Sequence, residues 1–316
     1  MLINCASAGS GGALTYVRNL IPRLVVNLIS KREISVVVLV RRSQLEWMRD
    51  IRKDAKFIVV PELPGYVRVI WEHITIGRIV RERQIDVVFT PYQIAPIFRR
   101  AVNIVMLRNM EPFKFTEYKG TIRNRLRNYS LRAKTLSVLR NANRVVGVSQ
   151  FVCDFMVRNS LVRQRSVVRI YHGKDTNYNP VVEPGDTHIL SQMGIDSRYI
   201  FTSGSLFPYR KCEDVISAFQ LLQDKGITLV VAGGGNDARY EKYLRKQIHE
   251  LGLESRVHLL GHVSQSRMVV LYRNSAVFVT ASECEACPNI AIEALSSGCS
   301  ILSSNVMSLP EIFQDS

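Results

Sequence analysis

The sequence predicts an α/β protein built from two facing Rossmann-like domains, and three observations lead to this prediction. Short runs of apolar, β-branched residues alternate with amphipathic helical segments along the chain. Turn and breaker residues are concentrated between two such series, in Asn177-Tyr178-Asn179-Pro180-Val181-Val182-Glu183-Pro184-Gly185-Asp186. A chain of 316 residues is also long enough for two separate cores. We therefore expect an N-terminal domain at 1–176, a linker at 177–186 and a C-terminal domain at 187–316.

The first half has the pattern of a doubly wound sheet. Short valine- and isoleucine-rich runs predict strands, and longer segments with helical periodicity predict the helices between them. The expected strands are Leu2–Ala6, Ile34–Val40, Lys56–Val60, Asp86–Thr90, Val102–Met106 and Arg144–Val148, and the expected helices are Ala13–Ile29, Val67–Arg83 and Thr121–Asn141.

The second half repeats the pattern. Its expected strands are Tyr199–Ser203, Thr228–Ala232, Val257–Leu260, Ala276–Ala281 and Ser300–Ser303, and its expected helices are Cys212–Gln223, Ala238–Leu251 and Ser264–Asn274. Ligands of such sheets bind outside the carboxyl ends of the strands, so we expect a binding cleft between the two domains.

Composition narrows the class of protein. With 47% hydrophobic and 22% charged residues, the chain is typical of globular proteins. The longest apolar runs, such as 34–40, have the length of strands, and no signal peptide precedes the first predicted strand. The six scattered cysteines do not form a secreted disulfide framework, so we expect a cytoplasmic location. Cys284 and Cys287 form a C-x-x-C pair without a second pair, so no metal site is expected.

Positive charge is concentrated in one part of the chain. Residues 1–98 carry 14 Lys+Arg and 8 Asp+Glu, residues 99–170 carry 16 and 3, and residues 171–316 carry 12 and 16, which gives nets of +6, +13 and −4. This distribution indicates a local docking surface and argues against a uniformly basic nucleic-acid-binding protein. The basic helix at 121–141 interleaves Arg123, Arg127 and Arg132 with apolar residues. It predicts either contact with an anionic membrane surface through 120–141 or an ordinary helix packed on the sheet with a solvated basic face.

Two glutamates eight positions apart, Glu285 and Glu293, follow the predicted strand 276–281. Pro288 suits the first turn of a helix and Gly298 the left-handed position after its end. Glu285 should then lie at the carboxyl edge of the sheet and Glu293 inside the bordering helix, both facing one ligand with hydroxyls and phosphate. The alternative is a solvated loop acid and an exposed helix residue.

Three glycine-containing loops follow other predicted strands. Gly9-Ser10-Gly11-Gly12-Ala13 opens the first helix, and Gly233-Gly234-Gly235-Asn236 gives an open-backbone turn. In Ser203-Gly204-Ser205-Leu206-Phe207-Pro208-Tyr209-Arg210-Lys211, the two adjacent cations are suited to hold a diphosphate. A solvated basic loop is the alternative interpretation.

These segments together resemble the retaining glycosyltransferases of group 1 and family 4, which have two Rossmann-like domains (the GT-B fold) and two glutamates eight positions apart. The resemblance covers almost the whole chain. It includes Val146-Gly147-Val148-Ser149-Gln150-Phe151, Tyr171-His172-Gly173-Lys174-Asp175, and a "Pro-Asn" variant of the donor signature at 285–295.

The resemblance implies transfer of a hexose-type sugar, with retention, from a nucleotide-diphosphate sugar to a glycan or lipid-linked acceptor in cell-surface polysaccharide or glycolipid synthesis. Arg210 and Lys211 would stabilise the leaving diphosphate, Glu285 would hold sugar hydroxyls, and Glu293 would accept from the ribose. No metal or other cofactor is expected, since no Asp-x-Asp element is present. The remaining donor-binding residues are expected to be Gly11, Gly12, Ser205, Gly234, Asn289 and Ile290.

The chain departs from the family pattern at two places. The strand ends at which relatives carry a histidine have none here, so Asn109 is the candidate for a contact to the sugar or acceptor. The chain ends shortly after Leu309-Pro310-Glu311, so the second domain is expected to lack its usual C-terminal strand and helices. A nucleotide-sugar epimerase of the same architecture and a non-catalytic basic nucleic-acid-binding protein are the alternative functions; no aromatic stacking platform favours the latter.

Overall fold

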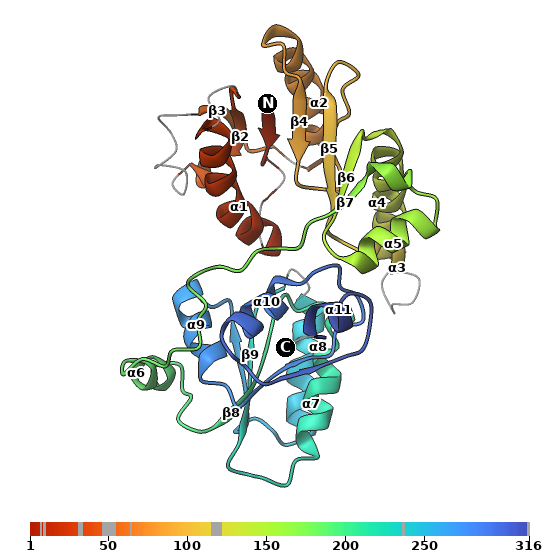
Figure 1. Cartoon of the computed structure of the whole chain (residues 1–316). Coiled ribbons are helices and arrows are strands. Elements are labelled where there is room, and N and C mark those ends of the chain that lie inside the picture. The colour runs from red at the N-terminus through yellow and green to blue at the C-terminus, as the bar shows by residue number, and fades with distance from the viewer. Residues whose placement is uncertain are drawn as a thin grey trace. The chain divides into compact units, whose positions relative to one another are not determined.

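The structure is a computed structural model that describes residues 1–6, 8, 11–30, 34–45, 55–63, 65–114, 122–235 and 238–314. The chain divides into two compact units (Figure 1). Among the described residues, unit 1 comprises those up to His172 and unit 2 comprises those from Gly173. Each unit contains its own parallel sheet, which confirms the predicted fold class of two Rossmann-like domains.

Unit 1 contains a seven-stranded parallel sheet with the order β3-β2-β1-β4-β5-β6-β7. Its strands are β1 (Leu2–Asn4), β2 (Val37–Arg41), β3 (Lys56–Val60), β4 (Val87–Thr90), β5 (Val102–Leu107), β6 (Arg144–Gly147) and β7 (Val167–Arg169). Its helices are α1 (Gly11–Ser30), α2 (Gly65–Glu82), α3 (Glu111–Lys114), α4 (Ile122–Asn141) and α5 (Gln150–Arg158). The strand order reverses between β1 and β4, which is the position where doubly wound sheets open to ligands.

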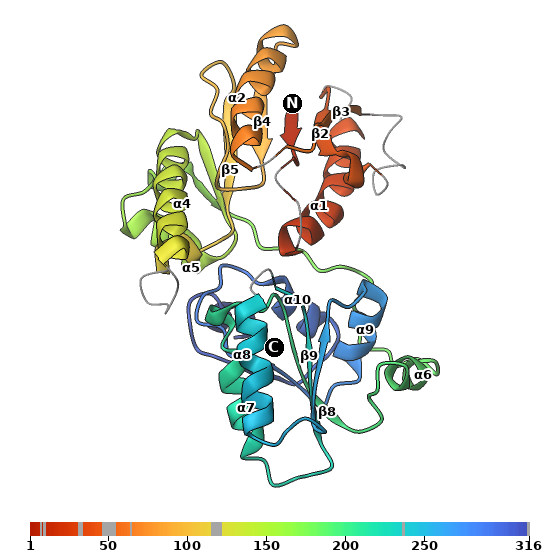
Figure 2. The ribbon, with the colours of Figure 1, turned by 180° about the vertical axis from the view of Figure 1, so that it is seen from behind.

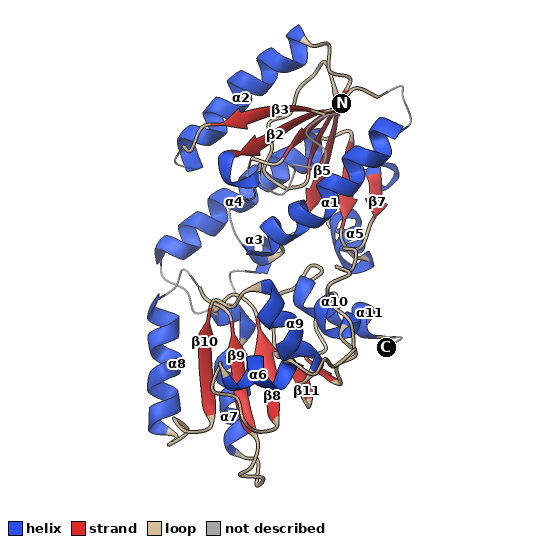
Figure 3. Cartoon of the chain, turned by 90° about the vertical axis from the view of Figure 1, so that its left-hand side faces the viewer, coloured by secondary structure: helices blue, strands red, loops and turns tan. Residues whose placement is uncertain are grey.

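Unit 2 contains a five-stranded parallel sheet with the order β10-β9-β8-β11-β12 (Figure 3). Its strands are β8 (Tyr199–Ser203), β9 (Thr228–Ala232), β10 (Val257–Gly261), β11 (Val277–Thr280) and β12 (Ile301–Ser303). Its helices are α6 (Asp186–Ser191), α7 (Cys212–Gln220), α8 (Ala238–Glu250), α9 (Gln265–Arg273), α10 (Asn289–Ser296) and α11 (Leu309–Phe313). Here the order reverses between β8 and β11.

Helices cover both faces of the unit 2 sheet. Because successive side chains of a strand point to opposite faces, the strands contribute to a hydrophobic cluster on either side. Along β9, Leu229 and Val231 enter one hydrophobic cluster, which α7 and α8 complete (Figure 2). Val230 and Ala232 enter the opposite cluster, which includes residues of α9 and α10. In unit 1, a cluster between α2 and the strands has the same construction. Near-continuous apolar strands were therefore the correct signal for parallel sheets.

The sequence analysis did not predict strand β7 or the helices α3, α5, α6 and α11. Strand β7 has only three residues, Val-Val-Arg. A run this short, with a single pair of apolar residues, does not stand out in the sequence as the other strands do. Helix α6 begins inside the predicted linker, because Asp186 is buried in an ion pair with Arg273 of α9 and accepts a hydrogen bond from Asn274. A partner 87 residues away gives no local sequence signal.

Helix α4 forms as predicted, but not all of its apolar residues face the protein. Ile122, Leu126 and Tyr129 are exposed, at 78%, 65% and 55%. Among the side chains of α4 that the structure describes, those of Asn128, Thr135, Val138 and Leu139 are buried. Helical periodicity identifies residues that share a side of a helix, but it does not say which side faces the protein.

Candidate active site

The candidate site lies in unit 2, where the loops after β8 and β11 leave the carboxyl edge of the sheet. These two strands are neighbours, with Val277 paired to Ile200 and Phe278 to Phe201. The strand order reverses between them, so helices depart to opposite faces and the edge is left open at this point. Seven of the predicted site residues lie in these two loops or in α10, which follows the second: Ser205, Arg210, Lys211, Glu285, Asn289, Ile290 and Glu293.

The loop after β8 is held against the glycine loop after β9 by direct backbone packing. A Cβ atom on Gly233 would lie 1.8 Å from the carbonyl oxygen of Gly204, and Gly233 has a φ of +143°. The Gly204 N–H donates to the Ala232 carbonyl at 3.0 Å. Only glycine tolerates both the contact and the backbone conformation at Gly233. The predicted loop residue Gly234 follows directly and is exposed.

Arg210 and Glu285 form a buried ion pair between the two loops. The Arg210 guanidinium donates to the Glu285 carboxylate, and its Nη1 lies 3.5 Å from the Ser282 hydroxyl. The two side chains are only 18% and 7% exposed. Burial raises the pKa of Glu285 despite the opposing effect of Arg210. Burial is also the largest single influence on the pKa of Arg210 and acts to lower it, but Glu285 and Tyr209 together outweigh burial and the pKa is raised.

One buried donor of Arg210 has no partner among the residues that the structure describes. This donor is the Nε–H of the guanidinium. A buried donor without an acceptor destabilises the folded state, so such groups commonly mark a position that a ligand or water fills.

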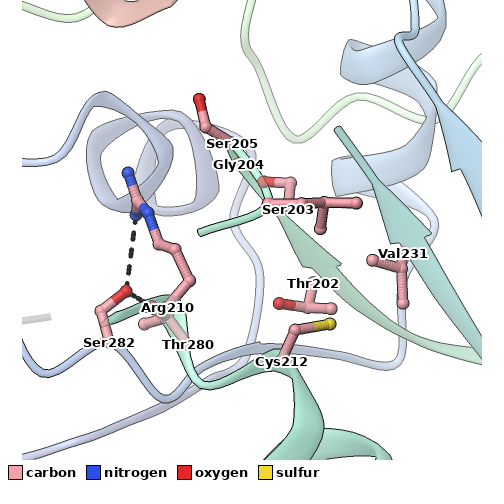
Figure 4. A pocket seen from close by; sticks show the side chains of 10 residues that line it. Thr202, Ser203, Gly204, Ser205, Arg210, Cys212, Val231, Thr280 and Ser282 are labelled. Carbon is pink, nitrogen blue, oxygen red and sulfur yellow. Dashed lines mark hydrogen bonds between the residues drawn. The ribbon is translucent and has the colours of Figure 1, made fainter. Parts of the chain in front are cut away.

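A small pocket that is partly open to solvent lies beside Arg210 (Figure 4). Backbone and side chains from the ends of β8, β9 and β11 surround it. Its lining residues are Thr202, Ser203, Gly204, Ser205, Leu206, Arg210, Cys212, Val231, Thr280 and Ser282. Ser205 is the predicted donor-binding residue that lines the pocket, together with Arg210. Hydroxyl groups and a guanidinium make this pocket suited to a polar, anionic ligand.

Glu293 reaches the same pocket through a tyrosine. The Tyr272 hydroxyl of α9 donates to the Glu293 carboxylate at 3.1 Å and lies 2.6 Å from the Ser203 hydroxyl, which lines the pocket. Tyr178 hydrogen-bonds to the same carboxylate. Burial is the main cause that raises the pKa of Glu293 to about 7, and Asp175 contributes in the same direction. The two glutamates thus have different partners: Glu285 contacts the pocket-lining Arg210 directly, whereas Glu293 is connected to the pocket through Tyr272 and Ser203.

Lys211 occupies a strained position at the start of α7. Its backbone is left-handed, with φ 54° and ψ 40°, which is uncommon for a residue with a side chain. Its Nζ lies 3.3 Å from a carboxylate oxygen of Glu283, and this hydrogen bond is the main cause that raises the pKa of Lys211. The Glu283 N–H donates to the Tyr209 carbonyl at 2.8 Å, so the loops after β8 and β11 are joined through the backbone as well.

The segment after β12 supports the loop that carries Glu285. The Ser308 hydroxyl donates to the Glu285 carbonyl at 3.2 Å, and the Ser304 hydroxyl donates to the Ser282 carbonyl at 2.7 Å. The Glu285 N–H points to the sulfur of Met307 at 3.3 Å. These contacts fix the backbone on both sides of the glutamate, so its carboxylate is placed before any ligand binds.

Helix α10 begins one residue later than predicted. Pro288 is the N-cap residue, and Asn289 and Ile290 form the first turn. Gly298 has a φ of +69° just past the helix end, which confirms its predicted left-handed position. Glu293 lies about one turn inside the helix, so the eight-residue spacing places one glutamate on the loop and the other on the helix.

The remaining predicted residues, Gly11, Gly12 and Asn109, lie in unit 1. Gly11 and Gly12 open α1, and the Gly12 carbonyl accepts a hydrogen bond from Arg108 at 3.0 Å. The side-chain oxygen of Asn109 accepts from the Glu111 N–H at 2.8 Å, so it caps the start of α3. Gln93 holds the backbone of Asn109 through two hydrogen bonds of 2.9 Å.

The sequence analysis did not predict two side-chain contacts of Tyr16 in unit 1. The Arg108 guanidinium lies 4.2 Å from the centre of the Tyr16 ring, and that ring lies 4.8 Å from the ring of His172. Arg108 could have been predicted as a site residue because it directly follows β5, whereas no local sequence pattern connects Tyr16 to His172. In unit 2, Tyr272 and Ser282 were likewise missed, because an apolar helix and a single serine carry no motif.

The described residues include no group of three or more His, Cys, Asp or Glu side chains placed to hold a metal ion. Within the same residues, no helix is long and apolar enough to span a membrane. All six cysteines are free thiols.

Comparison with known proteins gives two family matches that together cover most of the chain. Residues 10–178 match the model described as Glycosyltransferase Family 4, and residues 191–316 match the model described as Glycosyl transferases group 1. An uncharacterized glycosyltransferase of Methanocaldococcus jannaschii is 30% identical over 120 residues, which cover 38% of this chain and 30% of that relative. The chain therefore matches less than a third of the length of that curated relative.

Solved structures share the fold. Anabaena HepE in complex with UDP-glucose superposes with a TM-score of 0.76 at 17% identity, covering 98% of this chain and 81% of that one. The lipopolysaccharide glycosyltransferase WaaG superposes with a TM-score of 0.74 at 14% identity, covering 100% and 84%. Since the first family model spans more than half of the chain and the second covers the unit that holds the pocket, this protein belongs to the group 1 and family 4 glycosyltransferases.

Proposed function

We propose that this glycosyltransferase moves a hexose-type sugar from a nucleotide-diphosphate donor, with retention of configuration, to a glycan or lipid-linked acceptor. The observation that carries the proposal is the buried Nε–H of Arg210, which has no partner among the described residues and belongs to a side chain that lines a polar pocket. A phosphate oxygen is an acceptor that would satisfy this donor and also match the positive charge.

In the proposed complex, Arg210 keeps its ion pair with Glu285 and turns its remaining donors toward the diphosphate. Lys211 adds a second positive charge, at the cost of its contact with Glu283. Both cations would stabilise the negative charge that develops as the sugar departs. Glu285 and the amides that follow it would hold sugar hydroxyls, and Glu293 would accept hydrogen bonds from the ribose in exchange for one of its tyrosine partners. Gly11, Gly12, Ser205, Gly234, Asn289 and Ile290 are proposed to complete the donor site, with Asn109 contacting the sugar or acceptor.

The shared fold with HepE, whose structure was solved in complex with UDP-glucose, supports a nucleotide-sugar donor. We further propose that no metal takes part, because Arg210 and Lys211 supply the positive charge that a metal would bring to the diphosphate. Removal of divalent ions with EDTA should then leave donor binding and turnover unchanged.

The donor can be identified by calorimetric titration of the whole chain with UDP-, GDP- and ADP-sugars. Saturable binding of one of them is expected, and Arg210→Lys should weaken it because the ammonium cannot replace the paired donors of the guanidinium. If none of these donors binds, the assignment of the pocket is wrong.

The stereochemistry and the alternative function need a second experiment. With the donor found above and a glycan acceptor, the anomeric proton of the product should show by NMR the same configuration as the donor. An epimerase would instead convert the sugar nucleotide without an acceptor, so a new sugar nucleotide in the acceptor-free control would favour that alternative. A lipid-linked acceptor would require the enzyme to work at a membrane surface.

A further inference from the structure

Tyr272 of α9 connects Glu293 to the wall of the pocket through two hydrogen bonds. Its hydroxyl donates to the Glu293 carboxylate at 3.1 Å and lies 2.6 Å from the Ser203 hydroxyl. Ser203 is the last residue of β8 and lines the pocket (Figure 4). The Tyr272 side chain is fully buried, and its ring meets those of Phe201 and Tyr178 edge-on, with centres 5.0 and 5.7 Å apart. The packing of the ring therefore holds the hydroxyl in one place.

The number of hydrogens available fixes the direction of both bonds. A tyrosine hydroxyl has one hydrogen and an ionised carboxylate has none, so Tyr272 uses its hydrogen on Glu293. The bond between Tyr272 and Ser203 can then form only if Ser203 donates. The Ser203 oxygen keeps lone pairs but has no hydrogen left. On the side of the pocket it can therefore accept a hydrogen bond and cannot donate one.

An oxygen that only accepts is selective for one part of a nucleotide sugar. A phosphate oxygen is itself an acceptor and gains nothing beside Ser203, whereas a hydroxyl group of the ligand can donate to it. Arg210 lines the same pocket and has the opposite property, because its buried Nε–H has no acceptor among the described residues. The pocket thus combines a donor suited to phosphate with an acceptor suited to a hydroxyl group.

We propose that Tyr272 is a positioning residue of the donor site: it holds the Glu293 carboxylate in place and turns the Ser203 hydroxyl so that its oxygen accepts a hydrogen bond from a hydroxyl group of the ligand. The inference rests on the proposed function and deepens it, because it orients the ligand within the pocket. The diphosphate lies toward Arg210, and the hydroxyl group lies toward Ser203.

The direction of the two bonds depends on the charge of Glu293, because only the ionised carboxylate has no hydrogen of its own. Burial is the main cause that raises the pKa of Glu293 to about 7; Asp175 acts in the same direction, and the hydrogen bonds from Tyr272 and Tyr178 oppose it. Helices α9 and α11 also pack against α10, and their further charged residues are Arg267, Arg273 and Glu311. An ionised carboxylate accepts hydrogen bonds more strongly than a carboxylic acid, so donor affinity should rise with pH around the pKa of Glu293.

The first test follows donor affinity with pH. The full chain is titrated calorimetrically with UDP-, GDP- and ADP-glucose between about pH 5 and about pH 9, a range that covers both charge states of Glu293. Tyr272→Phe keeps the buried ring and removes the hydroxyl, so Glu293 loses a hydrogen bond that favours its charged form. The midpoint of the rise in affinity should therefore move up by about one pH unit.

Tyr199→Phe is the matched control for the pH profile. Tyr199 is buried in the same hydrophobic cluster as Tyr272, and its hydroxyl donates to the Leu271 carbonyl at 2.8 Å. The control also removes a buried tyrosine hydroxyl, but this hydroxyl does not bond to Glu293. Its midpoint should equal that of the unchanged protein. A change in packing alone lowers stability, which melting curves measure, and leaves the midpoint in place.

The second test starts from the other end of the two bonds. Ser203→Ala should weaken donor binding about fivefold or more at about pH 8, because the acceptor for the ligand hydroxyl is lost. It should leave the pH midpoint unchanged, since the bond between Tyr272 and Glu293 remains. In Tyr272→Phe the serine hydroxyl is no longer turned, so adding Ser203→Ala should weaken binding by less than about twofold. In Tyr199→Phe, adding Ser203→Ala should have its full effect.

Titration with UDP, GDP and ADP identifies the hydroxyl group. If Ser203→Ala weakens binding of the nucleoside diphosphate and of the nucleotide sugar by the same factor, the hydroxyl belongs to the ribose. If it weakens binding of the nucleotide sugar alone, the hydroxyl belongs to the transferred sugar. Both results support the inference, because each requires an acceptor at Ser203.

Three results would overturn the inference: an unchanged midpoint in Tyr272→Phe, unchanged donor affinity in Ser203→Ala, or an equal effect of Ser203→Ala with and without the Tyr272 hydroxyl. In each case the unchanged protein still binds a donor, so the proposed function stands. If the unchanged protein binds none of the nucleotides, the proposed function is wrong and the inference is wrong with it.

Discussion

Arg210 and Glu285 are opposite charges in a mostly dry environment, and each depends on the other. Moving either charge out of water is unfavourable, and the pair persists because the two groups are in contact. The sequence identified both residues but assigned them to different parts of a ligand. Their contact joins positions 75 residues apart and follows only from the adjacent ends of β8 and β11.

Removing one partner of this pair should be more harmful than removing both. Arg210→Met leaves a buried carboxylate without its cation and should lower the free energy of unfolding of unit 2 by about 3 kcal/mol. Arg210→Met/Glu285→Leu should recover most of that loss, because neither charge remains. Urea denaturation of the single and double variants measures the difference, and simple additivity of the two single changes would contradict a coupled pair.

Glu293 should make stability depend on pH. Its pKa is raised to about 7 in the folded protein, mainly by burial, whereas an unfolded chain has the ordinary value near 4.5. Between these values the folded state holds a proton that the unfolded state releases, so stability falls as the pH rises from about 4.5 to 7. Glu293→Gln removes this contribution. Melting temperatures across that range should therefore fall more steeply for the unchanged protein than for the variant, and parallel curves would show that Glu293 has an ordinary pKa.

At the scale of elements, the loops after β8 and β9 act as one backbone layer under the pocket. The close approach of Gly233 to Gly204 makes the position of the pocket-lining residues depend on a main-chain contact. This dependence explains why a weak glycine motif at 233–235 is structurally important.

Gly233→Ala should therefore destabilise unit 2 strongly. The added Cβ would meet the Gly204 carbonyl oxygen at 1.8 Å, and backbone atoms cannot move aside as a flexible side chain does. We expect a loss of more than about 3 kcal/mol. Gly252→Ala is the matched control, because Gly252 also has a positive φ, +62°, but has nothing within 4 Å of the added atom. Its expected loss is about 1 kcal/mol. Similar denaturation midpoints for the two variants would show that the two loops do not pack as described.

Sequence patterns predicted the parallel strands well, because valine- and isoleucine-rich runs bounded by polar residues usually form buried strands in an α/β chain. β3, β8 and β9 have the predicted bounds. The patterns failed where long-range contacts decide: α6 needs the Asp186–Arg273 pair, and the orientation of α4 depends on which side the sheet accepts. For the site, loop positions at strand ends could be predicted, but Tyr272 and its contacts with Glu293 and Ser203 could not, because the three residues lie on separate elements.

At the scale of the whole molecule, two anionic partners are proposed for two different environments. The donor site is built around a buried arginine in the residue range 171–316, whose net charge is −4. The membrane contact predicted through 120–141 would instead use cations in the range 99–170, whose net charge is +13. Short-range, buried contacts would thus govern the donor, and long-range attraction would govern the membrane.

Salt should separate the two interactions. Screening is strong between exposed charges and weak between buried ones. Raising the ionic strength from about 0.05 M to 0.5 M should therefore reduce vesicle binding severalfold more than it reduces donor affinity. Parallel losses in vesicle sedimentation and in calorimetric donor titration would mean that the donor too is held by exposed charges.

The central claim is that the Glu293 carboxylate and the pocket beside Arg210 hold the donor. Its most direct test is the calorimetric dissociation constant of the nucleotide sugar at pH 8, where Glu293 is mostly ionised. Glu293→Gln should weaken binding about tenfold or more, because a hydrogen bond to a charged acceptor is lost. Glu250→Gln, which changes an exposed glutamate of α8 paired only with Lys246 among the described residues, should bind the donor like the unchanged protein. Equal donor affinity in the two variants would contradict the claim.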